Sequence, residues 1–211
     1  MQHAAEVAQH LLRIKAVKLN PQDPFTWASG MLSPIYCDNR VALSYPDTRN
    51  FLKSCLADAA TGFGSIDAVA GVATAGIAHG VLLADLLELP FAYVRAEAKG
   101  HGRRNQIEGD LASGSRVLLV EDLISTGGSS LKAADALREA AYEVAGVLAI
   151  FQYGFEKASK AFAERSLPLA TLCDYDALIR EAHAGGYVEA SDLKQLEAWR
   201  IDPDGWGALY V

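Results

Sequence analysis

Residues 117–130, VLLVEDLISTGGSS, join an apolar run to two carboxylates and then to a turn of small, hydroxyl-bearing and glycine residues. The apolar part is continuous, which is typical of a strand buried on both faces of a parallel sheet. Glu121 and Asp122 would stand at the carboxyl end of that strand, where open α/β sheets bind their ligands. The turn at 125–129 can present several N–H groups to an anion, and the following helix adds its positive end. The carboxylates therefore suit hydroxyl groups or a metal ion, and the turn suits a phosphate.

Predicted strands and helices alternate along the chain. Apolar runs at 66–72, 91–94, 144–151 and 167–172 are typical of strands, and helical periodicity follows the run at 66–72, over residues 81–87, and the central motif, over residues 131–141. This alternation predicts an α/β fold with a central parallel sheet flanked by helices and right-handed crossovers. At 211 residues the chain is most simply one domain, residues 1–211.

Other segments predict less regular structure. Apolar residues at helical spacing predict a helix over residues 4–17, which Asn20 and Pro21 would end. Residues 35–37 predict a short strand within a ligand-facing loop. Residues 95–110 are polar, contain glycine and lack periodicity, which is typical of a lid over a site.

The composition excludes several classes of protein. A net charge of −7 and a pI near 5.2 argue against a nucleic-acid or membrane-surface partner, because both reward excess Lys and Arg. Cys37, Cys55 and Cys173 are far apart, so neither a disulfide framework nor a zinc site is supported. No stretch resembles a signal peptide or a membrane span. We expect a soluble cytoplasmic protein.

The central stretch lacks the common nucleotide signatures GxxxxGK[ST] and GxGxxG. It resembles instead the signature of the type I phosphoribosyltransferases, a hydrophobic strand, two acids, two further residues and a T-G-G or T-A-G turn. The resemblance implies that the acids contact the ribose hydroxyls of 5-phosphoribosyl 1-diphosphate and that the turn holds its 5′-phosphate. An ordinary capped helix start would not explain two adjacent acids. The implied site comprises Glu121, Asp122, Leu123, Ile124, Ser125, Thr126, Gly127, Gly128 and Ser129.

Flanking segments narrow the family. Residues 29–40 resemble the substrate loop of orotate phosphoribosyltransferases, residues 93–109 resemble their mobile catalytic loop, and residues 71–76 resemble their diphosphate-facing turn. Four blocks in family order are more than a chance motif would give. The resemblance implies the type I phosphoribosyltransferase fold, with a hood built from about residues 1–40 and the C-terminal part. It also implies that phosphoribosyl diphosphate and orotate give orotidine 5′-phosphate and diphosphate, in pyrimidine biosynthesis.

The predicted catalytic loop gathers cations. Arg95, Lys99 and His101 place three potential cations within seven residues of an acidic protein. A diphosphate leaving group needs such a clamp, because negative charge builds on it as the glycosidic bond breaks. A solvated basic loop is the usual alternative, but the neighbouring phosphosugar motif favours the catalytic interpretation.

Further contacts follow from the resemblance. Thr74 and Ala75 lie in the turn that faces the diphosphate, which in the family often contains a non-proline cis peptide; a simple helix start is the alternative. Ser125 and Tyr36 are expected to contact orotate. Mg²⁺ is the expected cofactor, held mainly by substrate oxygens and water. The resemblance also implies a homodimer in which the catalytic loop of one subunit closes over the site of the other.

Four positions depart from the family pattern. Many relatives carry Lys at the position of Leu32, and some carry Lys at the positions of Ala28, Ala75 and Ala96. Backbone N–H groups and the three cations of the predicted catalytic loop would have to hold the diphosphate here. Two alternatives stay open, a phosphoribosyltransferase for another base and a regulatory protein that senses phosphoribosyl diphosphate while binding nucleic acid.

Overall fold

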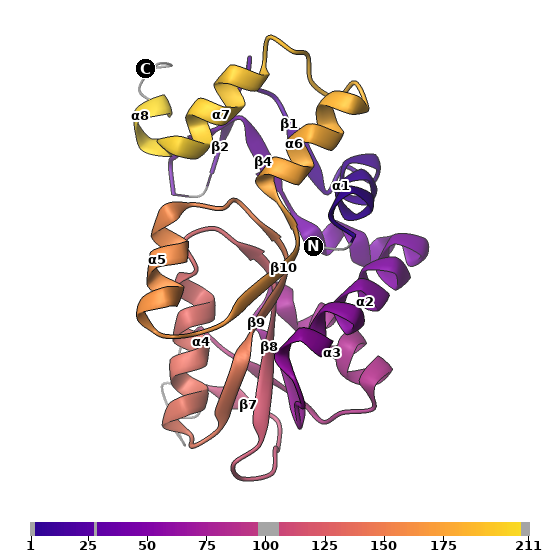
Figure 1. Ribbon diagram of the computed structural model, residues 1–211, viewed down its shortest axis with the longest axis vertical. Coiled ribbons are helices and arrows are strands. Elements are labelled where there is room, and N and C mark those ends of the chain that lie inside the picture. Colours follow the sequence, from indigo (N-terminus) through magenta and orange to yellow (C-terminus); the bar gives the residue numbers. More distant parts are fainter. Residues whose placement is uncertain (1–2, 28, 97–105, 208–211) are drawn as a thin grey trace.

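A mostly parallel sheet forms the centre of the molecule (Figure 1). The computed structural model describes residues 3–27, 29–96 and 106–207. Within them, a six-stranded sheet has the order β10-β9-β8-β5-β6-β7, in which only β7 runs antiparallel to its neighbour. The α/β fold with a central parallel sheet is therefore confirmed. The strands are β5 (Ala68–Val72), β6 (Phe91–Val94), β7 (Ile107–Glu108), β8 (Arg116–Ile124), β9 (Glu143–Gln152) and β10 (Leu169–Asp174).

Helices cover both faces of this sheet. Figure 1 shows α2 (Pro46–Ala60) and α3 (Ala75–Leu87) on one side and α4 (Gly128–Glu139) and α5 (Glu156–Glu164) on the other. Strand β8 shows why its apolar run is continuous. Its side chains alternate between two core clusters, one on each face of the sheet, and all four residues of the run are fully buried: Val117, Leu118, Leu119 and Val120.

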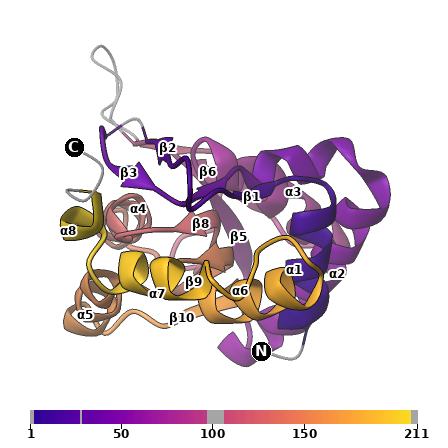
Figure 2. The same ribbon diagram turned by 90° about the horizontal axis from the view of Figure 1, so that it is seen from above.

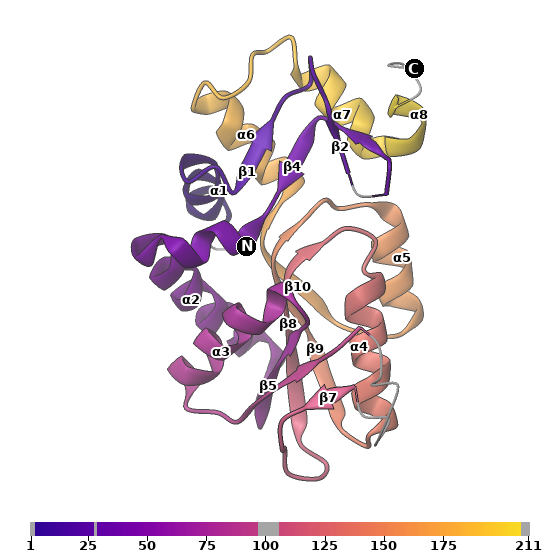
Figure 3. The ribbon, with the colours of Figure 1, turned by 180° about the vertical axis from the view of Figure 1, so that it is seen from behind.

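The two ends of the described chain pack together beside the sheet (Figures 1 and 3). We call residues 17–37 and 175–207 the terminal subassembly. Its strands form two antiparallel pairs, β1 with β4 and β2 with β3. Figure 2 shows these strands beside the C-terminal helices. The elements are β1 (Val17–Leu19), β2 (Phe25–Thr26), β3 (Leu32–Ser33), β4 (Ile35–Cys37), α6 (Tyr175–Ala184), α7 (Leu193–Ile201) and α8 (Pro203–Gly207).

Aromatic rings fill the terminal subassembly. Trp199 of α7 is fully buried, and its Nε1–H donates to the carbonyl of Leu32 over 3.3 Å. Its ring lies 5.7 Å from that of Trp27 and 5.5 Å from that of Tyr153, which follows β9. The aromatic cluster consists of Trp27, Tyr153, Phe155, Tyr175 and Trp199. It joins the N-terminal strands, the C-terminal helices and the sheet.

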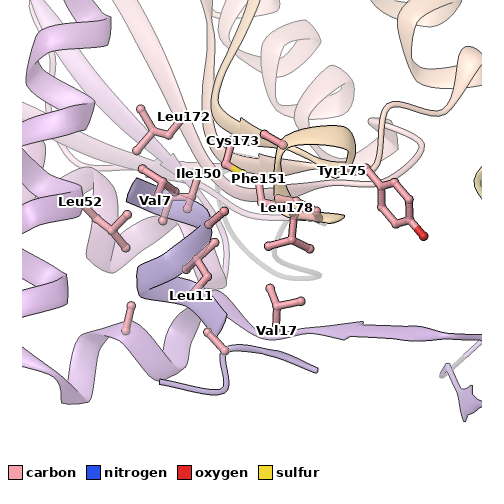
Figure 4. Packing of buried hydrophobic residues seen from close by; sticks show 14 of the residues in the cluster. Val7, Leu11, Val17, Leu52, Ile150, Phe151, Leu172, Cys173, Tyr175 and Leu178 are labelled. Atoms are coloured by element: carbon pink, nitrogen blue, oxygen red, sulfur yellow. The ribbon is translucent and has the colours of Figure 1, made fainter. Parts of the chain in front are cut away.

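The N-terminal helix α1 (Ala4–Arg13) anchors this arrangement to the core (Figure 4). Val7 and Leu11 are buried in the same cluster as Leu52 of α2, Ile150 of β9 and Leu178 of α6. Burying such side chains contributes roughly 1.5–3 kcal/mol each. The helix therefore ties the sheet, α2 and α6 together.

The predicted end of this helix was wrong. It was expected to continue to residue 17, but α1 ends at Arg13 and Lys15 has a φ of 58°. The chain turns there because Val17 pairs with Cys37 in an antiparallel ladder. A long-range strand pairing thus overrides the local helical pattern.

The loop predicted at 95–110 also contains structure. Strand β7 pairs Glu108 with Tyr93 and Ile107 with Val94, so the segment returns to the sheet edge.

Short 3₁₀ helices occur at η1 (Asn39–Ser44) and η2 (Thr61–Phe63). None of the helices in the described residues combines the length and apolar character needed to cross a bilayer.

Candidate active site

A cleft of about 280 Å³ opens at the carboxyl ends of β5, β6 and β8. Its walls come from Val72, Ala73 and residues 94–96 on one side and from Glu121, Leu123 and most of residues 125–133 on the other. Glu121 of the predicted acidic pair, the predicted phosphate turn and Arg95 are thus brought to one cavity, whereas Asp122 does not line it. Parallel α/β sheets place their ligands at this edge.

Two adjacent glycines in the turn have different roles. Gly127 has a φ of 80°, and a Cβ there would lie 2.6 Å from the ring of Phe162. A Cβ on Gly128 would meet nothing closer than Thr126 Oγ1 at 3.9 Å. Gly127 is therefore required by the fold, whereas Gly128 leaves open space in the cleft wall.

The turn leads into α4 without an N-cap side chain. Its N-cap residue, Gly127, can offer only backbone atoms to the first turn of the helix. Helix N-termini carry unsatisfied N–H groups and a partial positive charge. The start of α4 is therefore suited to bind an anion in the cleft.

Of the acidic pair, Glu121 is buried and Asp122 is partly buried. Glu121 is 6 % exposed and accepts hydrogen bonds from the N–H of Asp122 at 3.0 Å and from Oγ of Ser130 at 3.3 Å. Burial, with the neighbouring Asp122 carboxylate, raises the pKa of Glu121 to about 9. Burial also raises the pKa of Asp122, although the Glu121 carboxyl and Arg40 act in the opposite direction. A pair that retains a proton near neutral pH can both donate to and accept from sugar hydroxyls.

A buried asparagine fixes the predicted substrate loop to this pair. Asn39 is fully buried, and its Nδ2 donates to the carbonyl of Asp122 over 2.7 Å. On its other side lies His79 of α3, whose pKa burial lowers to about 4 while the backbone of Asn39 opposes the shift. Asn39 belongs to the predicted substrate loop, but its contact with Asp122 could not be predicted, because the two residues lie 83 positions apart.

Arg95 lies at the rim of the cleft. Its N–H donates to the carbonyl of Gln106 at 2.8 Å, and its guanidinium lies 3.5 Å from the Glu108 carboxylate. The residues on both sides of 97–105 are therefore held in the β6–β7 ladder. Lys99 and His101 lie outside the described residues, as does Ala28.

Other predicted residues lie beside the cleft. The peptide bond between Ala73 and Thr74 is cis, in the turn where the family resemblance implied one. Thr74 is exposed and Ala75 opens α3, but Ala73 is the residue of this turn that lines the cleft. Ile124 is buried in the core under α4.

Tyr36 lies on β4 in the terminal subassembly. It is 40 % exposed, its ring lies 5.9 Å from that of Phe25, and it does not line the cleft. Lys132 of α4 does line the cleft, although nothing in its sequence context distinguished it from a solvated lysine.

Comparison with known proteins adds a family assignment. The model of the phosphoribosyl transferase domain family matches residues 45–179. The chain is 53 % identical to the orotate phosphoribosyltransferase of Listeria innocua over 96 % of this chain and 97 % of that protein. It is 50 % identical to that of Porphyromonas gingivalis, over 95 % and 96 % of the two chains. The crystal structure of orotate phosphoribosyltransferase from Aeropyrum pernix is similar, with a TM-score of 0.75 and 30 % identity over 87 % of this chain and 99 % of that one.

Proposed function

The chain belongs to the orotate phosphoribosyltransferase family, and we propose that the cleft at the carboxyl ends of β5, β6 and β8 is its active site. The enzyme transfers the phosphoribosyl group of 5-phosphoribosyl 1-diphosphate to orotate, giving orotidine 5′-phosphate and diphosphate, a step of pyrimidine biosynthesis. One observation carries the site assignment. A single cleft joins a buried carboxyl at a strand end to a helix start that offers backbone N–H groups.

The sugar phosphate lies across the β8–α4 connection in this proposal. The 5′-phosphate binds residues 125–129 and the first turn of α4, where Gly128 leaves space. The ribose hydroxyls bind Glu121 and Asp122. The diphosphate then extends toward Thr74, Ala75 and Arg95, on the opposite wall. The 5′-phosphate end of the substrate thus lies at the end of β8, and its diphosphate end lies at the ends of β5 and β6.

Catalysis is proposed to rest on orientation and on stabilising the leaving group. Orotate arrives as an anion, so little general-base help is needed. Arg95 stands at the rim, and Lys99 and His101 belong to the segment that begins two residues after it. Ser125 and Tyr36 are proposed contacts of orotate.

Mg²⁺ is the proposed cofactor. Glu121 and Asp122 offer two carboxylates with raised pKa values, and no three His, Cys, Asp or Glu side chains gather within residues 3–27, 29–96 and 106–207. Two such carboxyl groups are too few to hold Mg²⁺ by themselves. They fit an ion that takes most of its ligands from the diphosphate, the ribose and water. Bound Mg²⁺ would neutralise charge on the diphosphate.

The chain is proposed to form one domain, with a hood over the site built from about residues 1–40 and the C-terminal part, which include the terminal subassembly. Asn39 supports this, because it opens η1, two residues after β4, and hydrogen-bonds to Asp122 of β8. A cytoplasmic location is proposed from the acidic composition and the free thiols of Cys37, Cys55 and Cys173.

A direct absorbance assay tests the activity. Orotate absorbance should fall when the purified protein receives phosphoribosyl diphosphate and Mg²⁺, and Asp122→Asn should slow this fall strongly. Glu139→Gln, on the exposed face of α4, is the matched control and should behave like the wild type. Turnover of adenine, guanine or uracil in place of orotate would favour the enzyme alternative, and binding without turnover would favour a sensor.

A homodimer with loops acting in trans is also proposed, and mixed subunits test it. Lys99→Ala disables the loop, whereas Asp122→Asn disables the site. If loops act in trans, refolding equal amounts together should restore about a quarter of wild-type activity, since half of the dimers then hold one intact site of two. A mixture no more active than its components would contradict the trans arrangement.

A further inference from the structure

A lysine of α4 faces the cleft from the side of the phosphate turn. Lys132 and Arg95 are the basic side chains among the described residues that line the cleft. The Arg95 guanidinium is already 3.5 Å from the Glu108 carboxylate. Within the described chain, Lys132 makes no ion pair or hydrogen bond through its side chain. Its charge is therefore available to a ligand.

Helix geometry directs this side chain toward the turn. Lys132 follows Gly128 by four positions, so the two residues lie one above the other on the same face of α4. Side chains on a helix lean toward its N-terminus. Gly128 has no side chain, and the space where a Cβ would stand is open. The lysine stem can therefore extend over Gly128 to the place where an anion would bind.

The electrostatics at the start of α4 favour an anion beside Lys132. A cation near a helix N-terminus is opposed by the positive end of the helix dipole. No acidic side chain in the described residues compensates Lys132, and the nearby Glu121 has a pKa raised to about 9. A phosphate would satisfy both the helix start and the lysine.

We propose that Lys132 is a substrate-binding residue whose ammonium group binds the 5′-phosphate of phosphoribosyl diphosphate and of orotidine 5′-phosphate. This inference rests on the proposed position of the 5′-phosphate in the β8–α4 turn. Lys132 stands on the wall of that turn, whereas Arg95 and Ala73 stand on the wall of the diphosphate turn. Lys132 therefore selects for the phosphorylated end of the sugar and not for the leaving group.

Kinetics of Lys132→Met test the proposal. The KM for phosphoribosyl diphosphate should rise about tenfold, while kcat and the KM for orotate change less than about twofold, because a contact made equally in ground and transition states alters binding alone. Lys132→Arg should restore most of the affinity. The melting temperature should stay within about 2 °C, since the side chain is exposed. Lys157→Met, on the exposed face of α5, is the matched control and should leave all constants unchanged.

Competition experiments identify the group that is bound. The inhibition constant of ribose 5-phosphate should rise about tenfold in Lys132→Met, because the inhibitor binds more weakly. The inhibition constant of diphosphate should stay within about twofold of its wild-type value. An unchanged KM for phosphoribosyl diphosphate, or equal weakening of both inhibitors, would overturn the proposal. If the wild type turns over orotate and only the Lys132 predictions fail, the proposed function stands. A wild type without transferase activity would instead overturn the proposed function.

Discussion

Two strand-turn-helix units meet at the cleft, β5 with α3 and β8 with α4, and each has a glycine in the first turn of its helix. In α3, a Cβ on Gly76 would collide with the carbonyl of Val120 and lie 3.2 Å from Cα of Glu121. In α4, a Cβ on Gly128 would enter open space. The first glycine lets a helix touch the neighbouring strand, and the second leaves room for a ligand. The same residue type thus serves packing in one unit and access in the other.

The strand ends differ as well. Strand β8 carries the buried Glu121 and the partly buried Asp122 near its carboxyl end, whereas β5 ends in Val72, which belongs to the apolar core. The proposed partners of the sugar hydroxyls therefore lie at one of the two strand ends. The turn after β5 offers backbone and small side chains, which suits a diphosphate that other groups also hold.

Gly76→Ala should have the largest effect. The new methyl group would push α3 away from β8, and overpacking of this kind costs about 3 kcal/mol when backbone must move. Urea unfolding should show this loss in the free energy of unfolding. An alanine variant as stable as the wild type would mean that α3 does not depend on this close contact.

Gly128→Ala should separate binding from folding. The methyl group would occupy the space proposed for the 5′-phosphate and raise the KM for phosphoribosyl diphosphate about thirtyfold, or about 2 kcal/mol. Stability should be equal or slightly higher, because Gly128 does not have a positive φ and alanine favours helix. Steady-state kinetics and urea unfolding measure the two effects, and a loss of stability as large as that of Gly76→Ala would erase the distinction.

Glu121→Gln should change how stability depends on pH. The folded-state pKa of about 9 exceeds the ordinary value of 4.5, so the folded protein holds the proton more tightly than the unfolded chain. This carboxyl therefore makes the wild type lose stability as pH rises between those values. Glutamine removes that loss, so the variant should gain on the wild type by about 1–2 kcal/mol from pH 5 to pH 9 while losing activity.

Denaturation at several pH values tests this, with the exposed Glu164→Gln as control. The control should follow the wild-type pH profile. Parallel profiles for Glu121→Gln and the wild type would show that Glu121 ionises without cost in the folded protein.

Ala75→Lys should have the smallest effect. It restores a cation that some relatives carry in the diphosphate turn, at a half-buried position that opens α3. An added partly exposed charge contributes about 0.5 kcal/mol, so the KM for phosphoribosyl diphosphate should fall about twofold. Ribose 5-phosphate should bind as before, because it lacks the diphosphate; tighter binding of this ligand would place the two phosphate sites differently.

The sequence predicted what depends on local pattern. The apolar run of β8 and the strand at 91–94 appear where they were expected, because burial on both faces leaves a strong hydrophobic signal. Helix α5 was missed because its buried side chains are only Ala158 and Phe162. Two apolar positions are too few to show the 3.6-residue repeat by which a helix is recognised in a sequence.

Features that depend on long-range contacts could not be predicted. The end of α1 is set by a ladder with β4, and Asn39 meets Asp122 across 83 positions. The position of Lys132 four residues after Gly128 was readable in the sequence. The sequence alone does not show which face of α4 lines the cleft, so this spacing did not predict a binding role for Lys132.

The aromatic cluster of the terminal subassembly bears on the order in which the molecule is made. Trp199 donates to the carbonyl of Leu32, a residue 167 positions earlier. During synthesis the N-terminal strands must therefore wait for this contact until α7 has left the ribosome. The Trp27 and Trp199 rings lie 5.7 Å apart, so tryptophan fluorescence should report this last docking step separately from formation of the sheet.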